Sequence, residues 1–222
     1  MGKYIVKVLD AEFINQDVKR FIVEKPPEYV FVPGQGTELA INLPEWKDQF
    51  RPFTYTNLNS QNYLEFMVKI YTQRKGVTHQ LGKTNAGAEL IIGEPYGLIN
   101  YKGPGVFLAG GSGITPFISI FRHLYKENHL RGNKLIYSNR NVEDVILFQE
   151  LQKMLKTDLI PFFSHENSIG FSYNRIDRHY LIAAIKDFSQ YFYLCGPSDF
   201  VRDLSQILLD LGANLDSLVV EE

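Results

Sequence analysis

The feature that most constrains the fold is a change of sequence rhythm near the middle of the chain. Up to about residue 100, short runs with alternating or β-branched character follow one another closely, with Gly- and Pro-containing turns between them. From Val106 onward, apolar runs of strand length alternate with amphipathic helical patterns. Turn residues 101–105 separate the two patterns, so we expect two domains, residues 1–100 and 101–222.

The first half predicts an antiparallel β-barrel of the Greek-key type. Closely spaced strands joined by Gly/Pro turns are typical of such barrels. We expect one short helix among them, over residues 78–83. The expected strands are Lys3–Leu9, Arg20–Val23, Glu38–Leu43, Phe53–Asn57, Leu64–Tyr71 and Glu89–Ile92.

The second half predicts an α/β Rossmann-like parallel sheet with helices on both faces, because strands and helices alternate along it. The helix expected after Thr115 has apolar residues at i, i+3, i+4 and i+7, which gives it one buried face. Further helices are expected over residues 147–155, 178–186 and 198–211. The expected strands are Val106–Ala109, Leu135–Tyr137, Leu159–Phe163, Tyr191–Leu194 and Leu218–Val220.

Composition excludes several classes of protein. With 23 Lys and Arg against 25 Asp and Glu, the chain has no excess of positive charge of the kind that nucleic-acid binders carry. A single cysteine excludes a disulfide framework, a four-cysteine zinc site and an iron–sulfur cluster, and it suits a reducing compartment. No apolar segment has the length of a membrane span. We therefore expect a cytoplasmic monomer without a metal, a nucleic-acid partner or a membrane partner.

A glycine-rich loop is the clearest chemical signal. Residues Gly110–Pro116 read Gly-Gly-Ser-Gly-Ile-Thr-Pro, follow an apolar strand and open a helix. Glycines let a ligand approach the backbone, and a helix N-terminus offers free N–H groups to a phosphate. Thr115 also suits the helix cap and Pro116 the first helical position, so a capped turn without a ligand explains the same residues equally well.

Three further segments each allow a structural and a functional interpretation. Cys195–Pro197 ends a strand at the sheet edge where ligands bind, although a lone cysteine is more often a buried apolar residue. Arg51–Asn57 sets an arginine beside an aromatic ring and several hydroxyls, and Gly76–Thr78 opens the helix of the β half. Two anion sites on separate domains together with an aromatic platform favour the functional interpretation.

Together these segments resemble the ferredoxin–NADP reductase superfamily, in its bacterial flavodoxin-reductase-like branch, over nearly the whole chain. The family's flavin motif Arg-x-Tyr-Ser corresponds to Arg51–Thr54, and its second flavin motif corresponds to Gly76–Thr78. Its nicotinamide-nucleotide loop corresponds to Gly110–Pro116, and its Cys-Gly-Pro segment corresponds to Cys195–Pro197. Four motifs in the family's order are a far stronger signal than any one of them.

The resemblance implies that the barrel binds FAD. Arg51 would pair with the flavin pyrophosphate, as its planar guanidinium suits. Phe53, in place of the family's tyrosine, would lie against the isoalloxazine ring. Thr54, in place of the family's serine, would hydrogen-bond near the flavin N5. The other flavin-binding residues that the resemblance implies are Pro52, Lys69, Gly76, Val77 and Thr78.

The resemblance also implies that the second domain binds NADPH or NADH as its substrate. Thr115 would lie between the two cofactors, and Cys195 would stand beside the nicotinamide C4. Thr54 and Cys195 are therefore the expected catalytic residues. The printed sequence ends at Glu221-Glu222, without the terminal aromatic residue that covers the flavin in many relatives. The nucleotide-binding residues implied are Gly111, Ser112, Gly113, Thr115, Cys195, Gly196 and Pro197.

The choice between NADPH and NADH depends on the end of the strand that follows the phosphate-loop helix. That end faces the adenosine ribose in doubly wound sheets. Ser138 and Arg140 lie there and suit a 2′-phosphate, which would favour NADPH. Asp144 follows closely, and as an i,i+4 partner it would neutralise Arg140 and leave NADH equally suitable.

The implied activity is electron transfer from NAD(P)H to a one-electron carrier. Flavins accept two electrons as hydride and can release them singly. Because a single cysteine excludes a fused iron–sulfur domain, the carrier is expected to be external, either flavodoxin or ferredoxin. One alternative is an NADH-linked reductase component for an oxygenase or haem partner. Another is a nucleotide-sensing module without catalysis, against which the retention of Thr54, Thr115 and Cys195 counts.

Overall fold

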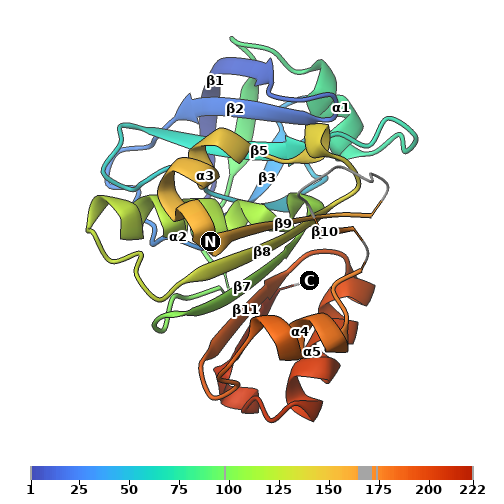
Figure 1. The fold of residues 1–222 in the computed structure, drawn as a ribbon. Coiled ribbons are helices and arrows are strands. Elements are labelled where there is room, and N and C mark those ends of the chain that lie inside the picture. The colour runs from blue at the N-terminus through green and yellow to red at the C-terminus, as the bar shows by residue number, and fades with distance from the viewer. Residues whose placement is uncertain (1, 98, 165–171, 174, 222) are drawn as a thin grey trace.

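The computed structural model describes the chain except residues 1, 98, 165–171, 174 and 222. It contains two six-stranded sheets. Figure 1 shows the first sheet, coloured blue to cyan, above the second, with α2 and α3 on the barrel-facing side of the second sheet and α4 and α5 on its opposite side. The predicted class, an antiparallel barrel followed by a parallel α/β domain, is confirmed.

The first sheet is an antiparallel barrel that nearly closes. Its strand order is β4-β3-β6-β1-β2-β5. The open edge lies between β4 and β5, where a bridge joins Tyr55 to Phe66 and the Thr56 amide donates to the Glu65 carbonyl at 3.0 Å. The elements are β1 (Tyr4–Phe13), β2 (Val18–Glu24), β3 (Gly36–Ile41), β4 (Arg51–Thr54), β5 (Tyr63–Lys69), α1 (Val77–Lys83) and β6 (Glu89–Ile92).

Two barrel elements differ from their predicted bounds. The strand expected over Phe53–Asn57 is β4, Arg51–Thr54, and Tyr55 beyond it makes a single bridge with its ring fully enclosed in the barrel core. Helix α1 begins at Val77 with Gly76 as its cap, so Thr78 lies inside the first turn. The sequence placed the helix correctly because Val77 and Leu81, four residues apart, are both buried in the barrel core.

The second sheet is parallel throughout. Its order is β10-β9-β8-β7-β11-β12, so the chain starts at β7, builds outward to β10, then crosses over to β11 and β12. The strand order thus reverses between β7 and β11, and ligands bind at the carboxyl ends of strands at such a point. The strands are β7 (Gly105–Gly110), β8 (Lys134–Asn139), β9 (Leu159–Phe163), β10 (Ser172–Tyr173), β11 (Tyr191–Cys195) and β12 (Leu218–Glu221).

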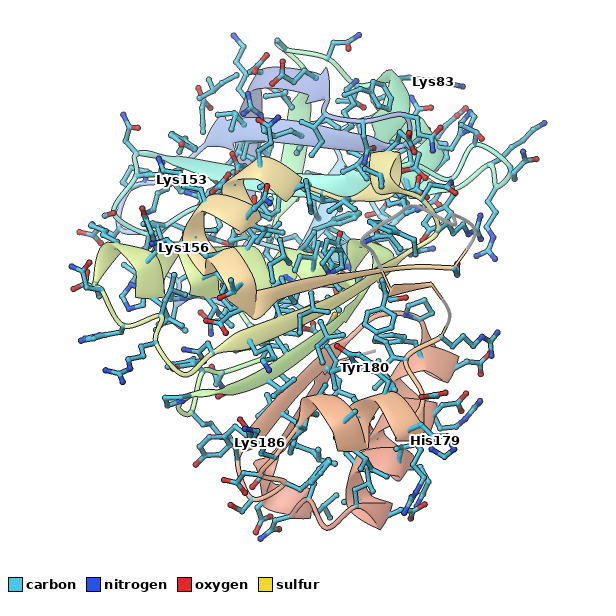
Figure 2. The ribbon with its side chains drawn as sticks, in the orientation of Figure 1. Lys83, Lys153, Lys156, His179, Tyr180 and Lys186 are labelled. Carbon is cyan, nitrogen blue, oxygen red and sulfur yellow. The ribbon has the colours of Figure 1, made fainter. Side chains whose placement is uncertain are left out.

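Helices cover both faces of this sheet. Strand residues alternate between the two faces, so Phe107, Leu135 and Tyr137 pack on one side and Leu108 and Ile136 on the other. Tyr180 of α4 points toward the sheet (Figure 2), and its ring meets the ring of Phe162 edge to face at 4.5 Å. The helices are α2 (Thr115–Lys126), α3 (Phe148–Leu155), α4 (Arg178–Ala184) and α5 (Ser198–Asp210).

One of the apolar clusters spans the junction between the two domains. Val18 and Met67 of the barrel pack in the same cluster as the apolar residues of α2 and α3. Ile99, in the segment between the last barrel strand and β7, is fully buried in that cluster. Among the described residues, no helix combines the length and the apolar character that a membrane span requires.

Candidate active site

A cavity of about 370 Å³ lies where the barrel meets the carboxyl ends of β7 and β11. This is the edge at which the strand order of the second sheet reverses, so the fold itself predicts a ligand there. The lining residues of the barrel side include Pro52, Phe53, Thr54, Lys69 and Thr78, and those of the other domain include Ser112, Gly113, Thr115, Cys195, Gly196 and Pro197.

A direct hydrogen bond joins the two domains inside this cavity. The Thr54 hydroxyl at the end of β4 donates to the Thr115 hydroxyl at the start of α2 at 2.8 Å. Thr115 was expected to cap its helix, but Ile114 holds the cap position and makes no side-chain cap bond. The threonine hydroxyl is therefore free to face the barrel, which brings together two residues that the sequence placed on separate motifs.

Two loops of the second domain, the one after β7 and the one after β11, pack backbone against backbone. A short 3₁₀ turn over Gly111–Ile114 lies between β7 and α2, and it touches the loop that follows β11. A Cβ atom at Gly113 would lie 2.2 Å from the Cys195 carbonyl oxygen, so only glycine fits at this position. The glycine-rich motif thus serves the packing of the two loops, and it also leaves Gly111 open, with no atom within 4 Å of its own Cβ position.

Cys195 is a partly buried thiol that stays protonated at neutral pH. Burial, followed by the nearby charge of Glu221, raises the pKa of Cys195 to about 12. The parallel pairing of β11 with β12 places Glu221 beside Cys195, and burial raises the pKa of the Glu221 carboxyl as well. Cys195 therefore offers a neutral contact to a ligand in the cavity rather than a thiolate nucleophile.

The flavin motif presents its polar groups to solvent and to the cavity. Arg51 is exposed and donates to the neighbouring Phe50 carbonyl at 2.6 Å. Phe53 is partly buried against the barrel core and lines the cavity. Gly76 lies beside open space, because a Cβ atom there would meet nothing within 4 Å. An aromatic platform, an exposed guanidinium and an accessible backbone are groups that fit a flavin nucleotide.

A second cavity, of about 570 Å³, adjoins the first and shares Lys69, Tyr71, Ser112 and Pro197 with it. Lys69 pairs with Asp17 at 3.0 Å, so its charge is partly balanced within the barrel. The cavity runs between the barrel and the ends of β7 and β8. The two adjoining cavities therefore continue into one another along the domain junction.

The structure does not bring Ser138 and Arg140 together. Ser138 faces the α4 and α5 side and lines a third cavity, of about 290 Å³, which also contains Arg175. Arg140 lies beyond the end of β8 and lines the second cavity. The Asp144 carboxylate, considered as a partner for Arg140, instead accepts hydrogen bonds from Gln16 at 2.8 Å and from Asn141.

Several lining residues lie outside the motifs that the sequence offered, among them Tyr71, Tyr96 and Glu221. Tyr71 follows Lys69 at a spacing of two, so strand alternation beyond the motif could have found it. Tyr96, whose hydroxyl donates to Glu38 at 2.7 Å, and Glu221 reach the cavity through pairing with distant segments. No local signal marks such residues, because their position depends on the tertiary fold.

Two family models together match most of the chain. The oxidoreductase FAD-binding domain matches residues 5–101, and the oxidoreductase NAD-binding domain matches residues 107–206. NADH-cytochrome b5 reductase 1 of Aspergillus terreus is 28% identical over 223 residues, which cover 89% of this chain and 73% of that protein. The reductase component of propane 2-monooxygenase from Rhodococcus jostii is 28% identical over 155 residues, 67% of this chain and 41% of that protein.

Solved structures share the fold over the whole length. A ferredoxin NADP+ reductase from Neisseria gonorrhoeae with bound FAD and NADP superposes with a TM-score of 0.87 at 19% identity, covering 99% of this chain and 98% of that one. The barrel, the nucleotide domain and the cavity between them define a flavin-dependent pyridine-nucleotide oxidoreductase. The chain belongs to the ferredoxin–NADP reductase superfamily, and it is an NAD(P)H-dependent enzyme that binds FAD.

Proposed function

We propose that this enzyme takes electrons from NAD(P)H and passes them singly to a separate carrier protein. The observation that supports this proposal is the cavity at the domain junction. There Phe53 and Thr54 of the barrel face Thr115 and Cys195 of the nucleotide domain across about 370 Å³. A flavin held by the barrel and a nicotinamide held by the other domain would meet in this space.

The chain's own residues act by positioning. Bound FAD supplies the hydride acceptor and the means to release electrons one at a time. Thr54 and Thr115 fix the spacing of the two domains at the reaction site through their 2.8 Å hydrogen bond. Cys195 contributes a neutral thiol, which adds no charge beside the nicotinamide. Holding both reactants in one orientation removes much of the entropic barrier to the reaction.

The remaining site residues would hold the phosphates. Arg51 is exposed and precedes Pro52 of the first cavity's lining, and it would pair with the flavin pyrophosphate, while Lys69 would reach the nucleotide half of FAD. Of the segment Gly76–Thr78, Val77 is buried in the barrel core, so it would contribute its backbone alone. The loop Gly111–Gly113 would hold the pyrophosphate of NAD(P)H, and Gly196 and Pro197 would close the site beside Cys195.

The carrier is the part of the proposal that purified protein can test most directly. Flavodoxin or ferredoxin is our first candidate. The names of the two relatives above favour a haem protein such as cytochrome b5, or an oxygenase, as the second. Anaerobic NADPH or NADH should bleach the bound flavin within seconds, and adding each oxidised carrier in turn should restore the yellow colour. A protein that binds both cofactors and never bleaches would be a sensing module, and the proposal would then be wrong.

We further propose that Ser138 and Arg140 contact the adenosine half of the dinucleotide, each from its own cavity, and that the enzyme prefers NADPH. Arg140 lines the second cavity, which also contains Lys69, and Arg175 lines the third. Steady-state kinetics on Arg140→Ala and Arg175→Ala test this preference. The variant that has lost the contact with the 2′-phosphate should show a lower ratio of kcat/KM for NADPH to kcat/KM for NADH than wild type. If neither ratio changes, neither arginine recognises the 2′-phosphate.

A further inference from the structure

Helix α2 carries a row of polar side chains that bond to the barrel. Thr115, Ser119, Arg122 and Lys126 lie at i, i+4, i+7 and i+11, which places them on one face of the helix. Ser119 accepts a hydrogen bond from the Gly34 amide at 3.0 Å, and Lys126 donates to Ser60 at 3.4 Å. Each of these bonds crosses from the nucleotide domain to the barrel.

Arg122 is the centre of this row. Its Nη1 donates to the Thr56 carbonyl at 2.9 Å and to the Glu65 carboxylate at 2.6 Å, both in the barrel. Its Nε and Nη2 make a two-pronged contact with Glu150 of α3, at 2.6 and 2.9 Å. Lys153, three residues further along α3, is exposed to solvent (Figure 2). The guanidinium therefore ties three elements together: α2, α3 and the edge of the barrel.

Glu65 makes this contact obligatory. Its side chain is only 6% exposed, and its Oε1 also accepts the Thr56 hydroxyl at 2.6 Å. A carboxylate removed from water requires a cation and hydrogen bonds around it, because an unpaired buried charge is strongly unfavourable. The cation is Arg122, which belongs to the other domain. The charge of Glu65 is therefore balanced only when α2 is docked against the barrel.

Two fixed points define the direction of α2 against the barrel. Thr115 meets Thr54 at the cavity, and Arg122 meets Glu65 seven residues later, about 10 Å along the helix axis. A single bond at Thr115 would act as a pivot, whereas a second bond two turns away prevents rotation about it. The phosphate loop immediately precedes α2, so its position relative to the flavin motif follows from the same two points.

We propose that the Arg122–Glu65–Glu150 cluster sets the alignment of the nicotinamide with the flavin. In the described part of the chain, none of these three residues lines the first or the second cavity, so Arg122 is a positioning residue that acts through α2. This inference rests on the proposed function. It predicts that the cluster controls the rate of hydride transfer more than the binding of either cofactor.

Arg122→Lys is the main test, because lysine keeps a positive charge beside Glu65 but loses the fork that spans Glu65 and Glu150. We expect the rate of flavin reduction at saturating NAD(P)H, measured in a stopped-flow instrument per bound FAD, to fall about tenfold. FAD content and the nucleotide Kd should stay within twofold of wild type. A second variant, Glu65→Gln with Arg122→Met, removes both charges together and should show the same pattern if the lysine variant folds poorly.

Arg20→Lys is the matched control. Arg20 also pairs with two carboxylates, Asp10 and Glu12, but all three lie in the β1–β2 hairpin of the barrel. This variant should reduce its flavin at the wild-type rate. A rate change of the same size in Arg20→Lys would mean that the effect comes from losing any such cluster, and the proposal would be wrong.

Hydrogen exchange gives a readout that does not depend on activity. The Gly34 amide is bonded to Ser119 across the domain junction, so its exchange reports directly on the seating of α2. We expect the peptide that contains Gly34 to exchange at least tenfold faster in Arg122→Lys and unchanged in Arg20→Lys. Unchanged Gly34 exchange together with a wild-type rate would overturn the proposal. If NAD(P)H does not reduce the flavin of the wild-type protein, the proposed function is wrong. The exchange of the Gly34 amide still tests whether the Arg122–Glu65–Glu150 cluster holds α2 against the barrel.

Discussion

Two arginines show how surroundings decide what one side chain does. Arg51 is exposed and donates a hydrogen bond to the carbonyl of its neighbour Phe50, so most of its guanidinium remains open to an anionic ligand. For Arg122, burial alone would lower the pKa, but hydrogen bonds to Glu150 and the charge of Glu65 raise it, so its charge is committed to the protein. The flavin motif marks Arg51 in the sequence, whereas no motif marks Arg122.

Replacing Arg51 with alanine should therefore affect the cofactor rather than the fold. A hydrogen bond to a charged group contributes about 1.5–3 kcal/mol, which corresponds to a loss of flavin affinity of about tenfold to a hundredfold. The melting temperature of the flavin-free protein should not change, because the side chain is exposed. Isothermal titration of the apoprotein with FAD measures the first quantity, and an unaltered Kd would mark Arg51 as a surface charge only.

Glu221 should make stability depend on pH. Burial raises its pKa in the folded protein above the usual 4.5. In the window between these two values the folded state holds more protons than the unfolded state, so stability decreases as pH rises through it and remains lower above it. Glu221→Gln should accordingly melt at a higher temperature than wild type at pH 7 and at the same temperature at pH 4. A difference that stays constant from pH 4 to pH 8 would contradict this.

At the scale of elements, the loops after β7 and β11 behave as one unit. The close approach of Gly113 to the Cys195 carbonyl joins two motifs that are more than eighty residues apart in sequence. Each loop therefore supports the shape of the other. A substitution in either loop should therefore weaken NAD(P)H binding and leave FAD binding by the barrel unchanged.

Gly113→Ala tests this coupling. The added methyl group would lie 2.2 Å from a backbone oxygen, so one loop must move, at a cost of about 1–3 kcal/mol. We expect at least tenfold weaker NAD(P)H binding and FAD content within twofold of wild type. Gly93→Ala is the matched control for stability, because a Cβ atom there would meet its nearest neighbour, the Thr37 hydroxyl, at an ordinary 3.6 Å. Equal nucleotide binding by Gly113→Ala and wild type would show that the loops are independent.

Sequence patterns predicted most elements but little of how they meet. The periodicity of α2 and the alternation of strands and helices in the second half follow from local burial, so their type and order were readable. The hydroxyl of Thr115 was misassigned to a helix cap because its partner, Thr54, lies 61 residues away. Arg122 and Glu65 gave no signal at all for the same reason, and the two-residue strand β10 is too short to form a pattern.

At the scale of the whole molecule, bound FAD should raise the free energy of unfolding. A ligand present at 100 times its Kd stabilises the folded state by about 2.7 kcal/mol, and each kcal/mol raises the melting temperature of a chain of this size by about 2–4 °C. Titrating apoprotein with FAD should therefore raise the melting temperature by about 5–11 °C. FMN lacks the adenylate that would reach Lys69 and Tyr71, so it should give a smaller shift. If FAD and FMN raised the melting temperature equally, the adenylate of FAD would not contact Lys69 or Tyr71.

The protonated state of Cys195 has a consequence for the lifetime of the enzyme. Reduced flavins react with dioxygen to give peroxide, which attacks thiolates and spares protonated thiols. The chain's single cysteine lines the cavity where that peroxide would form. With a pKa of about 12 it is almost entirely protonated in neutral solution. Burial therefore gives this residue resistance to damage by the enzyme's own side reaction.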